Sequence, residues 1–169
     1  AKLTLPATLT SIGESAFRGC YSLTSLTLPA SLVTIGDDAF HGCYALASVK
    51  FPASLVTIGL GAFRDCSSLT SLTFPASLVT IGLGAFAHCS SLTSVDFTAV
   101  TDANIGHSAF HDCERLVKVT LPAALSRIDD STFSRCSALV ELTLPTTLTN
   151  IGRNAFARCT SLSELTYLP

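Results

Sequence analysis

The residues of this chain that most resemble a metal site are two histidines with a carboxylate and a thiol nearby. His107 and His111 are four residues apart, and Asp112 and Cys113 follow directly. On a helix this spacing would place both imidazoles on one face, as in many zinc sites. Phe110, however, belongs to a repeating apolar pattern, and no third ligand is forced into range. We therefore expect exposed histidines on an outer surface rather than a metal site.

Seven cysteines recur at one repeating position, which could indicate a disulfide framework. Their number is odd, no C-x-x-C pair is present, and unpaired cysteine is a common small hydrophobe in protein cores. We predict buried free thiols, with disulfides between neighbouring turns as the alternative. Such thiols survive in reducing and oxidising compartments alike, so they do not indicate the compartment. The cysteines are Cys20, Cys43, Cys66, Cys89, Cys113, Cys136 and Cys159.

Patterns for other chemistry are weaker still. Serine is abundant, but no G-x-S-x-G elbow and no paired acid and base stands out from the repeating positions. The Gly-Leu-Gly segments at 59–61 and 82–84 lack the later glycine and the strand-to-helix setting of a dinucleotide loop. The sequence thus predicts no enzyme, no cofactor and no metal.

Self-similarity explains why these residues recur. Columns of Phe, Cys, Ile and Leu repeat through seven copies with a step of 23 residues and a single step of 24. One copy reads L-x-x-L-x-L-P-x-x-L-x-x-I-G-x-x-A-F-x-x-C-x-x, seen cleanly from Leu23 to Cys43. A single copy cannot bury its apolar side chains, whereas stacked copies form a continuous core. The Phe and Ile columns are Phe17, Phe40, Phe63, Phe86, Phe110, Phe133 and Phe156, and Ile12, Ile35, Ile58, Ile81, Ile105, Ile128 and Ile151.

This pattern resembles the BspA-like leucine-rich repeat, also called the treponemal type, over essentially the whole chain. The resemblance implies a right-handed solenoid used mostly for adhesion or protein recognition in surface proteins of bacteria and microbial eukaryotes. It favours a cell-surface or extracellular location, although the sequence itself contains no signal segment.

The residues alone predict a similar architecture. In Leu26-Thr27-Leu28 both leucines point inward, as in a half-buried strand, and the proline that follows ends the strand. Each copy then contributes one short parallel strand to a sheet face. The Ala-Phe-x-x-Cys segment predicts a short 3₁₀ or α-helical turn on the other side. We expect a leucine-rich-repeat solenoid of the mainly β or α/β class, roughly 35 Å long.

The turns between these elements depend on a glycine column. A glycine follows the Ile column in six copies, and we expect it to allow positive φ where the backbone bends. Asp129 replaces this glycine in one copy, and Asp tolerates the left-handed region better than most residues.

We expect residues 1–169 to form a single domain of about seven 23-residue repeats. One extra residue near 98–104 predicts a small bulge, with Val100 in place of the usual leucine, and the segment 165–169 also carries an extra residue. Neither end shows the polar cap that a solenoid needs. We therefore expect the chain to be a fragment of a longer array, or a partner to cover each end.

Composition narrows the choice of partners. Hydrophobic residues make up 48% and charged residues 13% of the chain, and the net charge is −2. No apolar run reaches the roughly 18 residues of a membrane span, and no block of Lys or Arg offers a basic face to nucleic acid. We expect protein partners, either a host or matrix protein or the neighbouring subunits of an assembly.

The outward strand positions are the predicted interaction surface, since solenoids commonly use the sheet face for recognition. This face is small and polar and lacks aromatic or Arg anchors, which favours an avid contact over several repeats. The alternative is that Ser and Thr merely suit exposed strands. Leu60 and Leu83, in an otherwise charged column, are a second candidate contact. The predicted face comprises Ser25, Thr27, Ser48, Lys50, Ser71, Thr73, Ser94, Asp96, Lys118, Thr120, Glu141 and Thr143, continued by Glu164 and Thr166.

These observations favour a non-catalytic repeat module for protein–protein interaction or adhesion. The alternative is a scaffolding subunit docked in a large multi-subunit assembly. A further alternative is an ice- or carbohydrate-binding face of regularly spaced hydroxyls. Lys50, Asp96, Lys118 and Glu141 interrupt those rows, which argues against a flat lattice match.

Overall fold

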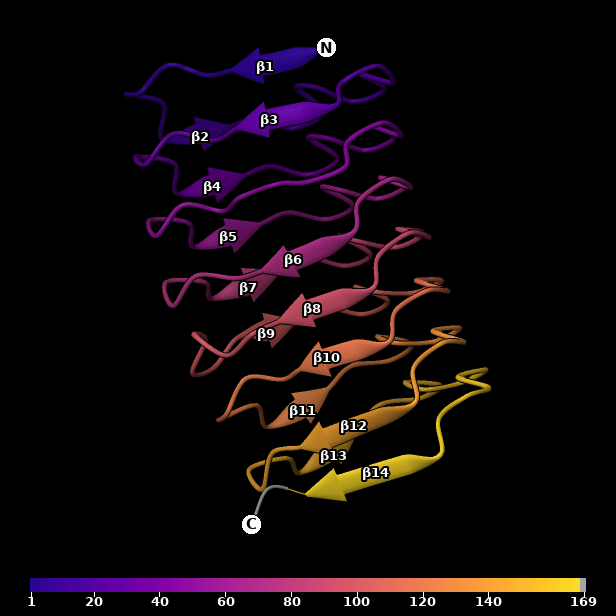
Figure 1. The fold of residues 1–169 in the computed structure, drawn as a ribbon. Helices are drawn as coiled ribbons and strands as arrows, with labels where there is room; N and C mark the ends of the chain where they lie inside the picture. The colour runs from indigo at the N-terminus through magenta and orange to yellow at the C-terminus, as the bar shows by residue number, and fades with distance from the viewer. Residues whose placement is uncertain (168–169) are drawn as a thin grey trace.

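The computed structural model describes residues 1–167, which wind into a solenoid of stacked coils (Figure 1). Each coil runs along one strand, turns a corner into a shorter strand, and returns through a stretch of tight turns. The first and last strands lie at opposite ends of the stack. Within residues 1–167 there is no helix, so the solenoid is mainly β.

One side of the stack, here called the long-strand face, carries the strands that the sequence predicts. Equivalent residues pair in parallel register, so that Leu72 lies beside Val95 and Val95 beside Val119. The segment Ser48–Lys50 is an exception, because only Ser48 forms an isolated bridge, to Ser25. The strands of this face are β1 (Lys2–Thr4), β3 (Ser25–Thr27), β6 (Ser71–Thr73), β8 (Ser94–Asp96), β10 (Lys118–Thr120), β12 (Glu141–Leu144) and β14 (Glu164–Tyr167).

The opposite side, the short-strand face, was not predicted from the sequence. Each of its strands ends on an Ile of the repeating column. In five coils the N–H of the next residue donates to the Ile carbonyl of the preceding coil, as from Gly82 to Ile58 at 2.8 Å. These two-residue strands are too short to produce an alternating pattern. They are β2 (Ser11–Ile12), β4 (Thr34–Ile35), β5 (Thr57–Ile58), β7 (Thr80–Ile81), β9 (Asn104–Ile105), β11 (Arg127–Ile128) and β13 (Asn150–Ile151).

The Ala-Phe-x-x-Cys segments form consecutive tight turns instead of the expected helical turn, and together they make up the turn edge of the stack. From Gly13 to Cys20, alternate N–H groups donate three residues back along the chain. The N–H groups between them, at Ser15, Phe17 and Gly19, donate to carbonyls of the following coil at 2.8 Å each. Two left-handed residues allow this alternation, with φ of 54° at Ser15 and 70° at Gly19. A helix could not provide these bonds between coils, because its N–H groups point along its own axis.

The glycine column has a different role from the one expected. None of its six glycines has positive φ, and neither does Asp129. Instead, a Cβ at Gly82 would lie 2.5 Å from backbone atoms of Gly59 and Leu60 in the preceding coil. At Gly13, in the first coil, nothing lies within 4 Å of such a Cβ. Glycine is therefore required for the close approach of neighbouring coils.

Asp129 coincides with a break in the stack. On the short-strand face β9 does not pair with β11, and on the long-strand face β10 does not pair with β12. Because a Cβ in this column cannot lie against the preceding backbone, Asp129 holds the two coils apart. We call this boundary, between residues 104–121 and 127–144, the seam. The turn edge remains bonded across it, as from the Phe110 N–H to the Thr132 carbonyl at 2.9 Å.

The core forms the predicted continuous column. Adjacent rings from Phe17 to Phe156 stack with centroids 5.2 to 5.8 Å apart and interplanar angles of 3° to 14°. A second stack, formed by Phe51, Phe74 and Phe97, packs edge-on against the first. Stacking of equivalent side chains therefore hides the apolar residues that dominate the composition.

The coil with the extra residue regains its register at β9, where Asn104 pairs with Thr80. Val100 is buried, and its N–H donates to the Phe97 carbonyl at 2.8 Å. The second extra residue was expected within 165–169, a segment that lies partly outside the described residues.

Candidate interaction face

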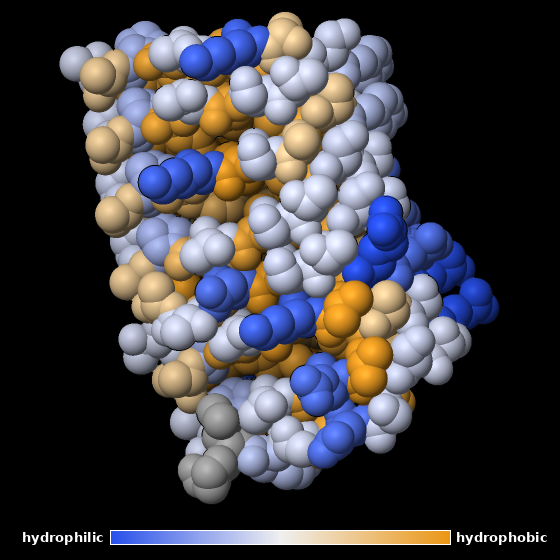
Figure 2. All heavy atoms as spheres, viewed as in Figure 1, coloured by the Kyte–Doolittle hydropathy of each residue, from blue (hydrophilic) through white to orange (hydrophobic). Residues whose placement is uncertain are grey.

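The predicted outward rows lie on the long-strand face. Strand alternation buries Leu72 and Val95 while exposing Ser71 and Thr73 on either side of Leu72. Figure 2, which views this face, shows small polar side chains over most of it, with charged side chains at intervals and apolar surface between the strands. The face is therefore polar at its crests and apolar in its grooves.

Six of the predicted residues share one hollow of about 380 Å³ that crosses β6, β8 and β10. Parallel register brings them together although they are up to two repeats apart in the sequence. They are Ser71, Thr73, Ser94, Asp96, Lys118 and Thr120.

Asp96 is the one carboxylate of this hollow, and it is held by its own loop. The backbone N–H of Thr98 donates to Asp96 Oδ1 at 2.8 Å, and the Thr98 hydroxyl donates to the same oxygen at 2.5 Å. These hydrogen bonds, helped by the charge of Lys118, lower the pKa of Asp96 below its ordinary value. Asp96 therefore remains an anion fixed in position, which suits binding better than proton transfer.

A second hollow, of about 640 Å³, lies where the seam reaches the long-strand face between β10 and β12. The predicted residues Lys118, Thr120, Glu141 and Thr143 line it. Val117 and Val140 also line it and are exposed, although the sequence analysis did not select them. The signal was present, because the same column holds Thr24, Ala47, Thr70, Thr93 and Ser163 in other copies.

The remaining predicted residues are less concentrated. Thr27 and Lys50 line a hollow of about 400 Å³, and Lys50 also borders one of about 330 Å³. Ser25 and Ser48 form the isolated bridge and line none of these four hollows. Leu60 and Leu83 are exposed as predicted, but they follow β5 and β7 and so lie away from the long-strand face.

The histidines belong to a chain of charges along the turn edge. His41 lies 3.1 Å from Asp38 and 3.2 Å from Asp65, and His88 lies 3.4 Å from Asp112. Two neighbouring columns of the turn edge carry Arg, His or Asp in several successive coils, so stacking brings opposite charges together. Comparing these columns across the repeats would have revealed this chain of charges, which the sequence analysis missed.

His107 and His111, which the sequence analysis weighed as a metal site, contact separate carboxylates. His107 lies 3.6 Å from Asp129, whereas His111 lies 3.6 Å from Asp112, so the two imidazoles have different partners. Burial lowers the pKa of His111, which favours its neutral form. Among residues 1–167, no group of three or more His, Cys, Asp or Glu side chains could hold a metal ion.

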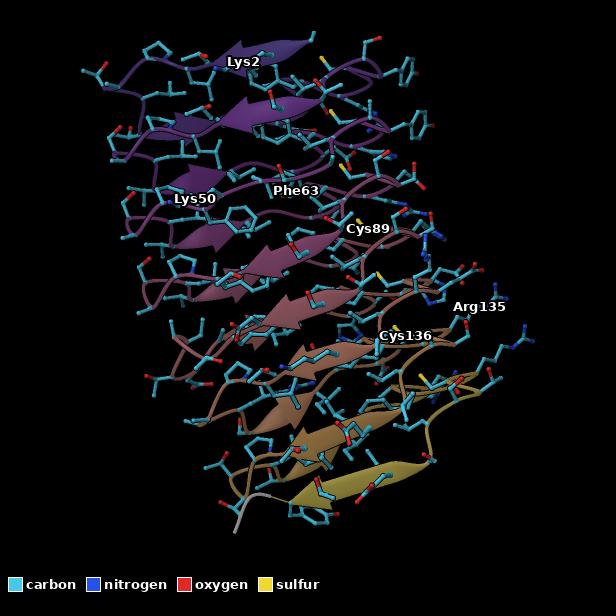
Figure 3. The ribbon with its side chains drawn as sticks, in the orientation of Figure 1. Lys2, Lys50, Phe63, Cys89, Arg135 and Cys136 are labelled. Carbon is cyan, nitrogen blue, oxygen red and sulfur yellow. The ribbon has the colours of Figure 1, made fainter. Side chains whose placement is uncertain are left out.

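The cysteines are free and, from Cys43 to Cys136, buried. Figure 3 shows Cys89 and Cys136 within the stack, while Arg135 extends outward from the turn edge. The Cys89 thiol donates to the Phe63 carbonyl of the preceding coil at 3.3 Å, and every later cysteine makes the equivalent bond. Burial raises the pKa of the Cys43 thiol to about 11 and that of Cys89 further. The prediction of buried free thiols is confirmed from Cys43 to Cys136. It is wrong for Cys20, which is exposed, and only partly met by Cys159, because the end coils lack a neighbour on one side.

The repeat pattern matches the BspA-type leucine-rich repeat region, in six copies, over residues 1–104 and 103–168. The chain belongs to this family. Among curated proteins, none matches the sequence.

Solved structures of leucine-rich repeat proteins share the fold. A T. pallidum leucine-rich repeat protein is 37% identical, with a TM-score of 0.90 over 96% of this chain and 78% of that protein. One from Eubacterium ventriosum is 31% identical, with a TM-score of 0.84 over 96% of this chain and 43% of the other. A leucine-rich cell surface protein from Faecalibacterium prausnitzii is 23% identical, with a TM-score of 0.56 over 99% of this chain and 60% of that one, and shows the fold alone.

No helix within residues 1–167 is long and apolar enough to cross a bilayer.

Proposed function

We propose that this BspA-type repeat chain is a non-catalytic module that binds another protein through its long-strand face. The observation that carries the proposal is that eight of the twelve predicted outward residues line two adjoining hollows, which share Lys118 and Thr120. Membership of a leucine-rich-repeat family supports it, because such proteins generally bind proteins and are generally not enzymes.

The chemistry of the face indicates how it binds. The sequence contains no Trp, and Tyr21 and Tyr44 stack on each other beside the turn edge. The third tyrosine, Tyr167, is exposed at the end of β14, outside the two adjoining hollows. Because the hollows lack large anchors, no single repeat can supply most of the binding energy there. The partner must therefore contact several coils at once, each contributing modestly.

Between the two settings considered, we favour recognition or adhesion over permanent docking in an assembly. Obligate interfaces are large and hydrophobic, whereas this face has polar crests of Ser, Thr and single charges. An ice- or carbohydrate-binding role would require a flat face of regular hydroxyls. This face is instead hollowed and is interrupted by the charges of Lys50, Asp96, Lys118 and Glu141.

Site-specific photo-cross-linking in the organism that encodes the chain tests this proposal. A photoreactive residue at Ser94, in the centre of the face, should form a covalent adduct with a discrete partner protein. The matched control is Thr57, which lies on β5 of the short-strand face. Adducts that form equally at both positions, or only at Thr57, would contradict the proposal.

A further inference from the structure

The seam forms a groove beside β10 that reaches the edge of the core. The lining includes the outward side chains of Lys118 and Thr120 as well as the inward side chains of Val119 and Leu121. Val119 is 7% exposed and Leu121 is 8% exposed, whereas Val95, the equivalent of Val119 one coil earlier, is 1% exposed. The groove therefore offers more apolar surface than the paired strands β6 and β8 do, as does the unpaired segment Ser48–Lys50, where Val49 is 9% exposed.

Backbone donors in the groove have no partner among residues 1–167. One coil earlier, the Phe97 N–H donates to the next coil at 3.0 Å and the Val117 N–H donates to the preceding coil at 2.9 Å. Their equivalents, at Leu121 and Val140, make no such bond because β10 and β12 are not paired. β10 and β12 lie too close together for a further strand to fit between them. These donors are therefore left for water or for polar groups of an extended segment that lies over the groove.

The rim of the groove combines apolar and charged groups. Val117 is 49% exposed and Val140 is 46% exposed, and each is followed along the chain by a charged residue, Lys118 and Glu141 respectively. Figure 2 shows apolar side chains beside charged ones at the lower right of this face. A segment that carries an aliphatic side chain between two opposite charges would match this rim.

We propose that the groove between β10 and β12 binds an extended segment of a partner protein. The segment lies over the groove, an aliphatic side chain packs between Val117 and Val140, and flanking residues of opposite sign face Lys118 and Glu141. The inference rests on the proposed function, and it names the part of the face that is contacted and the form of the partner. A lipid tail would leave the two charges unmatched.

Two fluorescein-labelled peptides test the groove by fluorescence anisotropy: Thr-Asp-Val-Lys-Val-Thr and its charge-reversed form Thr-Lys-Val-Asp-Val-Thr. The chain should bind one charge order about tenfold more tightly than the other. The double variant Lys118→Glu/Glu141→Lys should reverse this preference. Binding of neither peptide at millimolar concentration, or an unchanged preference in the double variant, would overturn the proposal.

Apolar contact is tested separately with matched pairs of exposed valines. Val117→Ser/Val140→Ser should weaken peptide binding about tenfold. Val33→Ser/Val79→Ser, which alters exposed valines beside β4 and β7, should leave it unchanged. Circular dichroism establishes that both double variants are folded, and equal losses of peptide binding in both would refute the groove.

The two proposals fail in different ways. Partner adducts at Ser94 without peptide binding would reject the groove alone. Absence of any adduct on the long-strand face would reject the proposed function.

Discussion

The cysteine column shows how a residue that suggests chemistry serves the core. Each buried thiol donates to the carbonyl of a phenylalanine in the preceding coil, at 3.3 Å from Cys66 and from Cys89. The carbonyl that accepts the Cys89 thiol belongs to Phe63, which also accepts the N–H of Cys66. Burial raises the thiol pKa, so the nucleophilic thiolate is suppressed. Cysteine is thus used as a small apolar side chain with a weak donor.

Thiol labelling tests this interpretation. At pH 8, iodoacetamide should modify Cys20, the one cysteine in the exposed class, and leave Cys66, Cys89 and Cys113 unmodified in the folded chain. Mass spectrometry after proteolysis identifies the labelled positions, and all seven cysteines should react in denaturant. Labelling of Cys89 at the rate of Cys20 without unfolding would contradict the account.

Thr98 and Asp96 give a second test at this scale. Removing the hydroxyl with Thr98→Val should raise the pKa of Asp96 towards its ordinary value of 3.8, as measured by NMR titration. A carboxyl whose pKa is lowered by folding contributes stability above its ordinary pKa, and this stability is lost as the pH falls through the folded value. The variant should therefore be less stable than the wild type at pH 7 and equally stable below about pH 2. The same deficit at both pH values would show that Thr98 acts by packing.

Among the structural elements, the short-strand face depends on glycine more than on side-chain packing. Its strands pair closely because the backbone of one coil lies against the glycine of the next. Gly36, Gly59, Gly82 and Gly106 each leave a hypothetical Cβ within about 3 Å of the preceding backbone. The seam at Asp129 shows the consequence of a Cβ at this position.

An alanine pair measures this effect. Gly82→Ala should lower the free energy of unfolding by about 1–3 kcal/mol, because the coils must separate or the strands must shift. Gly13→Ala should be neutral or slightly stabilising, because nothing lies within 4 Å of its Cβ and φ there is not positive. Urea denaturation gives both values, and equal effects of the two substitutions would refute the role assigned to the column.

At the scale of the whole molecule, the coils form a one-dimensional stack in which each contacts only its neighbours. The Phe column runs through all the coils, including the pair that flanks the seam, where the Phe110 and Phe133 centroids are 5.6 Å apart. The seam therefore weakens pairing on both faces without dividing the core.

The sequence predicted the stack better than its details. The Phe, Ile, Leu and Cys columns repeat with a constant step, so stacking and burial could be inferred from spacing alone. The role of Gly82 could not be inferred from spacing. A column of glycines does not show whether it lets the backbone bend or lets two coils approach each other closely. The outward rows were predicted by strand alternation. Val117 and Val140 were not predicted, because strand alternation selects the outward rows and these two residues lie in the column just before them. They are the two valines in a column that otherwise holds Thr, Ala or Ser.

Native-state hydrogen exchange tests most directly the claim that the core is one continuous stack and that the seam is the place where strand pairing is lost on both faces at once. The amides of Phe97, Gly106 and Val117, which bond between coils, should exchange slowly, and those of Leu121, Asp129 and Val140 should exchange much faster. Asp129→Gly should slow exchange at position 129, since glycine allows the coils to approach. Slow, uniform exchange of all six amides, or protection that divides the Phe column into separate cooperative blocks, would contradict the account.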